Sequence, residues 1–401
     1  MRDLQDLVRV DAADVHKGAV LAGQLRRHGS LMEFSYREGY AGPAVATTLP
    51  MGLGPATAPP GAVPAFFAGL LPEGRRLVLL QQALKTSADD ELSQLLAVGG
   101  DTVGDVRVAP AGEEPASPAP RFDPAEADEV RFDRLLAASI GEVERIALPG
   151  VQLKVSARMQ TLPIRRGALS DAILKLETDD LPALVANERA CLSAARTAGL
   201  QVAEHRVVGD GTGRQALLVG RFDRIVRDGD VHAVAQEDGC QVLGLWPADK
   251  YRPSIESVVG GLAAVCAAPV VAALRLWEQV AFSYLLANGD LHAKNLSIRR
   301  GSRGWEPTPV YDVVCTHPYG DVLTMALPLA GDANPDRVSR SRFLAAAEGT
   351  GVPPPAMART LDRLLDRTVE VPEVLAELPI PGLRRAKLRR VLERRRERLG
   401  G

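Results

Sequence analysis

Two aspartates and an asparagine stand in an order that is typical of phosphoryl-transfer sites. Asp290 and Asn295 lie five residues apart in a short polar segment after a long apolar stretch, and Asp312 lies in an apolar run at 310–314 that is predicted to be strand-like. The first aspartate can accept a hydroxyl proton, while the asparagine and the second aspartate offer hard oxygen ligands to Mg²⁺. Asp290 and Asn295 alone could equally form a turn with local hydrogen bonds.

A lysine in the other half of the chain offers the cation that ATP phosphates require. Lys175 lies in the middle of the apolar run 172–176, where a charge is costly unless it has a partner. Glu188, on the helix predicted to follow, is a candidate partner. With Lys175 and Asp312 in order, the chemical interpretation of Asp290 and Asn295 is favoured over the simple turn.

The elements that must position these residues begin with a β-rich unit. Apolar and polar residues alternate over 32–37, as in a strand with one face on a core. Residues 111–129 contain four prolines and six acids against one base, which indicates a solvated linker. The other predictions are strands within 16–40, a loop over 49–64 and helices over 77–84 and 88–98.

Beyond the linker the pattern changes from strands to helices. Strands are predicted over 151–159, 172–176, 201–208 and 215–222, with a helix over 184–198 that ends at Gly199. From about residue 236 helical spacing dominates. We therefore expect an α+β fold with a cleft between its halves. Its expected parts are an N-terminal β-rich unit (1–110), a linker (111–129), a central β-rich part (130–235) and a helical part (236–401).

Composition excludes several classes of protein. The 401 residues are 46% hydrophobic and 24% charged, with a net charge of -2, which argues against disorder, a fibrous repeat, a membrane bundle or a protein that coats nucleic acid. Residues 384–398 carry nine bases and two acids. A solvated helix face is the simpler interpretation of this tail, and contact with tRNA or DNA is the alternative.

Cysteine usage and hydropathy indicate a cytoplasmic protein without a membrane span. The four cysteines form no CxxC pair, so they are expected to be small core residues. The N-terminus lacks the apolar stretch of a secretory signal. The uncharged stretch 258–274 is shorter than a span, and two buried helices that meet near Pro269 explain it better.

Short motifs along most of the chain occur in an order that resembles the HipA-like serine/threonine kinases, the toxins of bacterial toxin–antitoxin pairs. Each motif is weak alone, whereas their joint order is specific. The motifs are FFAGLLPEG (66–74), GGDTVG (99–104), GVQLK (150–154), ILKL (173–176), NE (187–188), RFDR (221–224), QED (236–238), CQ (240–241), KY (250–251), GDLHAKN (289–295) and YDV (311–313).

The resemblance implies a bilobal, protein-kinase-like fold with a β-rich N-terminal lobe and an all-α C-terminal lobe. It also implies that Lys175 holds the phosphates of ATP and that Asp290 is the catalytic base. Asn295 and Asp312 would bind Mg²⁺. In eukaryotic protein kinases the corresponding loop reads His-Arg-Asp, so their mechanism transfers to this chain only by analogy.

Further roles follow from the same resemblance. Glu188 would pair with Lys175, and His292 and Lys294 would shape the catalytic loop, with Lys294 able to offset charge on the transferred phosphoryl group. Arg221 and Phe222 would lie near the adenine-binding hinge. The phosphate-side loop would be formed by Gly150, Val151, Gln152 and Lys154.

Two positions depart from the family pattern. Ala147 stands where HipA-like kinases often carry a regulatory serine, so inactivation by autophosphorylation at that position is expected to be absent. Ser139 is too far away to be assumed as its substitute. Leu153 stands where an acid often follows the glutamine of the phosphate-side loop, which alters the expected contacts with ATP.

The function that the resemblance implies is that of an ATP- and Mg²⁺-dependent protein kinase acting as a growth-inhibiting toxin. Its target would be a translation factor such as an aminoacyl-tRNA synthetase. Its partner would be a small HipB-like helix-turn-helix antitoxin, and it would meet DNA only through that antitoxin. The alternatives are a kinase-like binding module that acts in repression with such a partner, and a small-molecule kinase.

Overall fold

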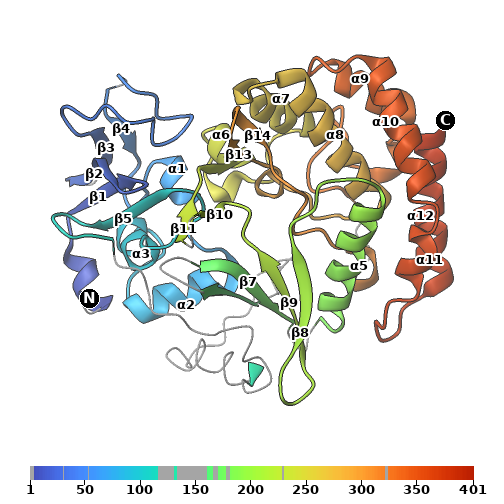
Figure 1. Cartoon of the computed structure of the whole chain (residues 1–401), viewed down its shortest axis with the longest axis horizontal. Helices are drawn as coiled ribbons and strands as arrows, with labels where there is room; N and C mark the ends of the chain where they lie inside the picture. Colours follow the sequence, from blue (N-terminus) through green and yellow to red (C-terminus); the bar gives the residue numbers. More distant parts are fainter. Residues whose placement is uncertain are drawn as a thin grey trace.

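The chain folds into a β-rich N-terminal unit, a central sheet flanked by a long helix, and a large, mainly helical lobe (Figure 1). This arrangement confirms the expected α+β fold class. The computed structural model describes residues 4–29, 31–52, 54–115, 131–132, 160–165, 170–177, 181–227, 230–320 and 324–401.

The N-terminal unit is built on a five-stranded antiparallel sheet in the order β4-β3-β2-β1-β5. Phe34 and Phe67, both almost fully buried, pack against each other between this sheet and its helices. The strands predicted within 16–40 are present, but β4 lies inside a segment that was expected to be loop. The elements are β1 (Ala12–Lys17), β2 (Val20–His28), β3 (Leu31–Tyr36), β4 (Ala56–Ala58), β5 (Val106–Pro110), α1 (Ala65–Ala68), α2 (Gly74–Leu84) and α3 (Glu91–Val98).

The central sheet runs in the antiparallel order β6-β7-β9-β8 and is covered by α5. Gly199, with φ +87°, ends this helix in the left-handed conformation that glycine adopts freely, as predicted. The predicted strand over 151–159 lies outside the described residues. The elements are β6 (Gln160–Arg165), β7 (Ser170–Leu176), α5 (Leu184–Thr197), β8 (His205–Gly209) and β9 (Gln215–Gly220).

The C-terminal lobe is organised around α8, whose side chains Trp277 and Phe282 are fully buried. Pro269 is the first residue of α8 and separates it from α7, so the break predicted at this proline is confirmed. The helices are α6 (Gly239–Val242), α7 (Ile255–Val265), α8 (Pro269–Leu285), α9 (Arg340–Glu348), α10 (Pro354–Arg367), α11 (Val371–Ala376) and α12 (Arg385–Gly400).

The C-terminal lobe also contains a small sheet, so the expectation of an all-α lobe is wrong. Strands β12 (Gln236–Asp238), β13 (Ser297–Gly301) and β14 (Gly304–Pro307) pair antiparallel. Their shortness and the charges in β13 hide the period-2 pattern that would reveal longer strands. A separate hairpin, β10 (Arg224–Arg227) with β11 (Asp230–Ala233), precedes this sheet.

Residues 310–314 do not form the predicted strand. Val310 makes only an isolated parallel bridge to Val202. Asp312 has φ +50°, in the left-handed region that ends an extended chain. The apolar character of this run therefore reflects burial of Val313 and Val314, rather than pairing in a sheet.

The buried residues that the structure describes form two separate hydrophobic cores. One lies within the N-terminal unit and includes Leu25, Phe34 and Leu95. The other joins α5 and the central sheet to the helices of the C-terminal lobe, so Leu192 and Trp277 belong to the same cluster. The N-terminal unit is attached to the rest of the molecule by polar contacts, such as the Glu73–Lys294 ion pair, and by the packing of Trp246 against its core.

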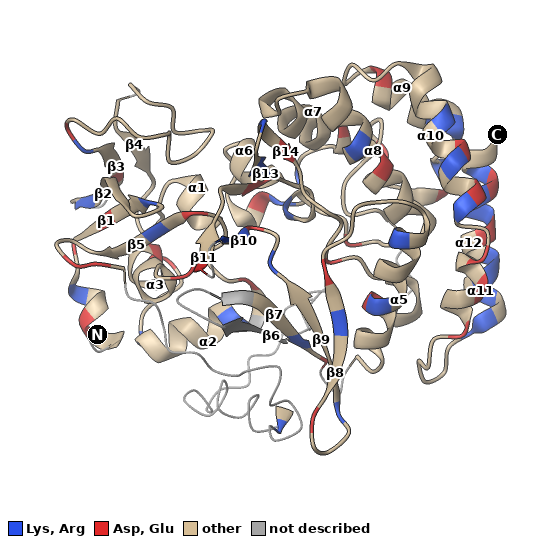
Figure 2. Ribbon diagram, in the orientation of Figure 1, with Lys and Arg blue, Asp and Glu red and all other residues tan. Residues whose placement is uncertain are grey.

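The basic tail predicted from the sequence forms the amphipathic helix α12. Its leucines face inward, and its bases alternate with acids of α10–α12 along one edge of the lobe (Figure 2). Arg385 and Arg389 pair with Glu377 and Glu373 of the α11 region, at 3.1 Å and 2.6 Å. These two ion pairs match part of the positive charge of the tail.

The remaining sequence expectations concern cysteines and membranes. All four cysteines are buried and free, as expected for core residues. Among the residues that the structure describes, no helix combines the length and the apolar character needed to cross a membrane.

The start of α6 lies unusually close to the chain ahead of β13. A Cβ atom on Gly239 would lie 2.6 Å from the carbonyl oxygen of Ala293 and 2.7 Å from the side chain of Val258. We expect Gly239→Ala to destabilise the protein by about 1–3 kcal/mol through overpacking, measured by urea unfolding. Gly260→Ala in α7 is the control, because its Cβ would only touch Thr350 at 3.8 Å. Equal unfolding midpoints for the two variants would refute this close approach.

Candidate active site

Lys175, Glu188 and Asp312 form one ionic cluster. The ammonium of Lys175, near the end of β7, lies 2.6 Å from Oε1 of Glu188 on α5 and 2.8 Å from Oδ1 of Asp312. The three residues come from three separate segments of the chain. The pairing of Lys175 with Glu188 confirms the partner predicted from the sequence. Lys175 and Glu188 are buried, whereas the side chain of Asp312 is 29% exposed and is the open side of the cluster.

Burial and charge decide the protonation of this cluster. Burial opposes the charged form of Lys175, but the two carboxylates more than offset it and raise its pKa. Burial also opposes ionisation of Asp312, and the ammonium overcomes it and lowers the pKa of Asp312. Burial raises the pKa of Glu188 against the pull of the same ammonium. The ammonium of Lys175 therefore favours the ionised form of Asp312, the more exposed of the two acids.

Asn187, the neighbour of Glu188, fixes the segment that carries Asp312. Its side-chain nitrogen donates to the carbonyl of Cys315 at 2.8 Å, and its oxygen accepts from the Cys315 N–H at 2.9 Å. This two-way clamp holds the chain just beyond Asp312 against α5. We did not assign Asn187 a role from the sequence, although it lies in one of the ordered motifs.

The 288–295 loop, which joins α8 to β13, carries Asp290 in a fixed backbone arrangement. The main-chain N–H of Asp290 donates to Oδ1 of Asn288 at 2.9 Å, and its carbonyl accepts from the side chain of Asn295 at 3.0 Å. The hydroxyl of Tyr251 lies 3.4 Å from Oδ1 of Asp290. The Asp290 carboxylate is thus a buried acceptor with an aromatic hydroxyl beside it.

The two residues predicted to bind Mg²⁺ offer oxygen atoms of the kind that this cation prefers. Because the amide nitrogen of Asn295 is committed to the Asp290 carbonyl, its oxygen is the atom it can offer to a cation. Asp312 adds a partly exposed carboxylate, and its lowered pKa keeps this group deprotonated. Oxygen ligands of this kind suit a hard divalent cation.

His292 is a buried neutral imidazole within the 288–295 loop. Its ring packs edge-on against Tyr251 with centroids 5.3 Å apart, and its Nδ1 has no hydrogen-bond partner among the described residues. Burial, with a contribution from the Lys250 ammonium, lowers the pKa of His292 to about 4. The side chain therefore contributes shape and a neutral hydrogen-bonding edge, not a positive charge, at neutral pH.

The ammonium of Lys294 is bound by acids instead of pointing freely into the site. It lies 3.0 Å from Glu73 of the N-terminal unit and 3.4 Å from Asp238, and it donates to the Gly69 carbonyl at 3.2 Å. The predicted neutralisation of a transferred phosphoryl group by Lys294 therefore competes with two carboxylates. Glu73 is not among the site residues predicted from the sequence, although the FFAGLLPEG motif contains it.

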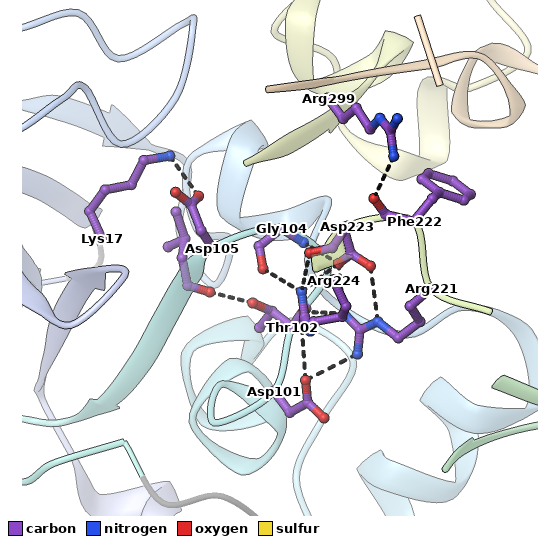
Figure 3. A network of polar contacts seen from close by, with 11 residues as sticks. Lys17, Asp101, Thr102, Gly104, Asp105, Arg221, Phe222, Asp223, Arg224 and Arg299 are labelled. Atoms are coloured by element: carbon purple, nitrogen blue, oxygen red, sulfur yellow. Dashed lines mark hydrogen bonds and ion pairs between the residues drawn. The ribbon is translucent and has the colours of Figure 1, made fainter. Parts of the chain in front are cut away.

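Arg221 belongs to a buried ionic cluster at the junction with the N-terminal unit (Figure 3). Its guanidinium pairs with Asp101 at 3.0 Å and with Asp223 at 2.8 Å. Arg224 contacts the same two aspartates at 2.9 Å and 2.7 Å. The side chain of Arg221, which was predicted to lie near the nucleotide, therefore forms ion pairs that join two parts of the chain.

Phe222 lies next to the site through its ring and its backbone. The ring contacts that of Tyr311, with the two ring centroids 5.2 Å apart, and Tyr311 directly precedes Asp312 in the chain. Its carbonyl accepts a hydrogen bond from Arg299 at 3.0 Å (Figure 3). The remaining predicted positions lie outside the described residues. These are Ser139, Ala147, Gly150, Val151, Gln152, Leu153 and Lys154.

The low pKa of His292 gives a pH dependence of stability. An unfolded histidine titrates near pH 6.5, so between about pH 6.5 and 4 the unfolded chain binds a proton that the folded chain does not. Stability from this residue is thus complete above pH 6.5 and is lost as the pH falls. We expect the wild type to lose up to about 3 kcal/mol more than His292→Gln between pH 7 and 4.

The measurement is urea unfolding at a series of pH values. His232→Gln, which changes an exposed histidine of β11, is the control and should follow the wild-type profile. Parallel profiles for the wild type and His292→Gln would contradict the assignment of a buried neutral imidazole.

Comparisons with known proteins identify relatives over most of the chain. The model of the HipA-like C-terminal domain matches residues 146–371, and that of the HipA N-terminal domain matches residues 13–109. A putative kinase, Y4mE, from Sinorhizobium fredii is 32% identical, over 86% of each chain. The serine/threonine-protein kinase toxin HipA of Shewanella oneidensis is 27% identical, over 91% of this chain and 88% of that protein.

A solved structure shares the fold. It is the complex of Shewanella oneidensis HipA with HipB and operator DNA, with a TM-score of 0.77, 24% identity and 97% coverage of both chains. The likeness extends over both the N-terminal unit and the C-terminal lobe. By its family models, its relatives and its ordered site residues, the chain belongs to the HipA family of serine/threonine kinases.

Proposed function

We propose that this kinase transfers the terminal phosphoryl group of ATP, with Mg²⁺, to a serine or threonine of a protein. The observation that carries the proposal is the contact of Lys175 with both Glu188 and Asp312. In protein kinases the corresponding lysine–glutamate pair and the metal-binding aspartate must both be in place for transfer. Here one ammonium joins the two acids.

Each residue has one task in this proposal. Lys175 binds the phosphates and stays oriented by Glu188. Asp290 accepts the proton of the attacking hydroxyl, while Tyr251 beside it limits where that hydroxyl can lie. Asp312 and Asn295 would hold Mg²⁺, which when bound neutralises charge on the phosphates. The neutral state of His292 avoids adding a second cation next to the base.

The biological role proposed is that of a growth-inhibiting toxin with a HipB-like antitoxin. A relative over most of the chain is a kinase toxin, and the solved complex with the same fold contains HipB and operator DNA. DNA would be reached only through the antitoxin. The target class, a translation factor such as an aminoacyl-tRNA synthetase, rests on the family resemblance.

Loss of the base should abolish transfer without abolishing nucleotide binding. For Asp290→Asn we expect phosphate transfer to fall roughly 10²- to 10⁴-fold, because the amide cannot accept the hydroxyl proton. Asp362→Asn, which changes a surface carboxylate of α10, is the control. Transfer of radiolabelled phosphate from ATP into a bacterial lysate measures both variants, and identification of the labelled band names the substrate.

Other outcomes distinguish the alternatives. Wild-type-like transfer by Asp290→Asn would refute the mechanism. Label appearing in metabolites and not in proteins would indicate a small-molecule kinase. Wild-type protein that labels neither class would indicate a binding module.

Neutralisation by an antitoxin gives a second expectation. Expression of the chain alone should arrest growth, and co-expression with a small helix-turn-helix protein encoded beside it should restore growth and give a complex in gel filtration. Growth arrest by Asp290→Asn equal to that of the wild type would show that toxicity does not depend on phosphate transfer.

A further inference from the structure

Glu73 is the point at which the N-terminal unit reaches the 288–295 loop. It directly precedes α2, whose first residue is Gly74, in the motif that follows α1. One of its carboxylate oxygens lies 3.0 Å from the ammonium of Lys294, and the other contacts the ammonium of Lys250. Burial opposes ionisation of Glu73, but these two ammonium groups overcome it and lower its pKa to about 2.

The two lysines that Glu73 binds lie on the two segments that surround Asp290. Lys294 directly precedes Asn295, whose side chain binds the carbonyl of Asp290. Lys250 directly precedes Tyr251, whose hydroxyl lies beside the Asp290 carboxylate. The carbonyl of Lys250 also accepts from the N–H of Ala293 at 3.1 Å, which ties the two segments together. Glu73 therefore bridges both sides of the base.

The surrounding charges require this bridge. Lys294 also pairs with Asp238, whose burial raises its own pKa, and it donates to the carbonyl of Gly69 in the N-terminal unit. With Glu73 neutral, Lys294 would keep Asp238 as its ion-pair partner, while Lys250 would lose the carboxylate that it contacts. The repulsion between the two ammonium groups would act on the segments that position Asp290.

The contact between α1 and α6 brings Glu73 to this place. The side chain of Gln241 donates to the carbonyl of Phe66 at 3.1 Å and caps α6 together with Asp238. A Cβ on Gly69 would lie 2.6 Å from Gln241, so only glycine allows this approach. The junction is thus closely packed at the motif that delivers Glu73.

We propose that Glu73 is a positioning residue for phosphoryl transfer, through which the N-terminal unit holds the 288–295 loop by way of Lys294 and Lys250. This inference rests on the proposed kinase reaction. It gives Lys294 the role of a tether in place of a contact with the transferred group. It also makes the N-terminal unit part of the catalytic apparatus.

The test compares steady-state kinetics of full-length variants on a labelled protein substrate. Glu73→Gln keeps the size of the side chain and removes its charge, and we expect kcat to fall roughly 10- to 100-fold with KM for ATP unchanged, since misplacement of a base slows the chemical step. Glu73→Asp keeps the charge and should recover a large part of kcat.

A matched control separates positioning from simple attachment of the two units. Asp101→Asn is the same carboxylate-to-amide change in the same junction, but Asp101 binds Arg221 and Arg224 at the hinge. We expect it to alter KM for ATP or the unfolding midpoint more than kcat. An equal loss of kcat in both variants would show that Glu73 acts only by attaching the units.

A double variant tests the route through Lys294. If Glu73 acts through this lysine, the double variant Glu73→Gln with Lys294→Met should lose no more kcat than the less active of the two single variants. Losses that multiply, or wild-type kcat in a folded Glu73→Gln protein, would overturn the proposal. A rise in kcat in that variant would also overturn it, because it would mean that Glu73 withholds Lys294 from the phosphoryl group.

The failure of this proposal is distinguishable from failure of the proposed function. A wild-type protein that transfers no phosphate would refute the kinase reaction itself. A wild-type protein that transfers phosphate, with Glu73→Gln unchanged, would refute only the role of Glu73. Circular dichroism of each variant establishes that the comparison is made between folded proteins.

Discussion

The structure around the site depends on one buried ammonium group. Lys175 lies near the end of β7 between Leu174 and Leu176, which are fully buried, so its charge is tolerated only because two carboxylates meet it there. One acid is brought by α5 and the other by the segment after β14. The position of α5 on the sheet and the left-handed turn at Asp312 are therefore linked to the same charge.

Apolar packing joins the central sheet to the C-terminal lobe, and ion pairs help to join the N-terminal unit to both. The central sheet and the C-terminal lobe share a hydrophobic core, which fixes Lys175 and Glu188 relative to α8 and the loop that follows it. The N-terminal unit has its own core, and the described residues join it to the rest through ion pairs at two places, one at Arg221 and Arg224 and one at the 288–295 loop. Ion pairs are directional, so such a junction specifies geometry more than it adds stability.

Much of the site could be predicted from sequence, because the chemistry of phosphoryl transfer restricts residue types and their order. The Lys175–Glu188 pair follows from the cost of a lone buried charge, and the structure confirms it. Asp290, Asn295 and Asp312 were singled out by the order of their residue types, and their catalytic and metal-binding roles stay predictions. The engagement of Lys294 by Glu73 was not predictable, since it joins residues far apart in the chain and in different units. The small C-terminal sheet escaped prediction because its strands are short and charged, and the turn at Asp312 broke a run whose apolar residues suggested a strand.

The junction also contains an intrinsic optical reporter. Trp246 packs against the core of the N-terminal unit from the other side of the junction, and its indole N–H donates to the carbonyl of Val63 at 3.1 Å. The other two tryptophans, Trp277 and Trp305, pack in the core of the C-terminal lobe. Movement of the N-terminal unit would expose Trp246 to water and leave the surroundings of the other two tryptophans unchanged. The fluorescence emission of Trp246 would therefore report whether the unit is docked in the native protein.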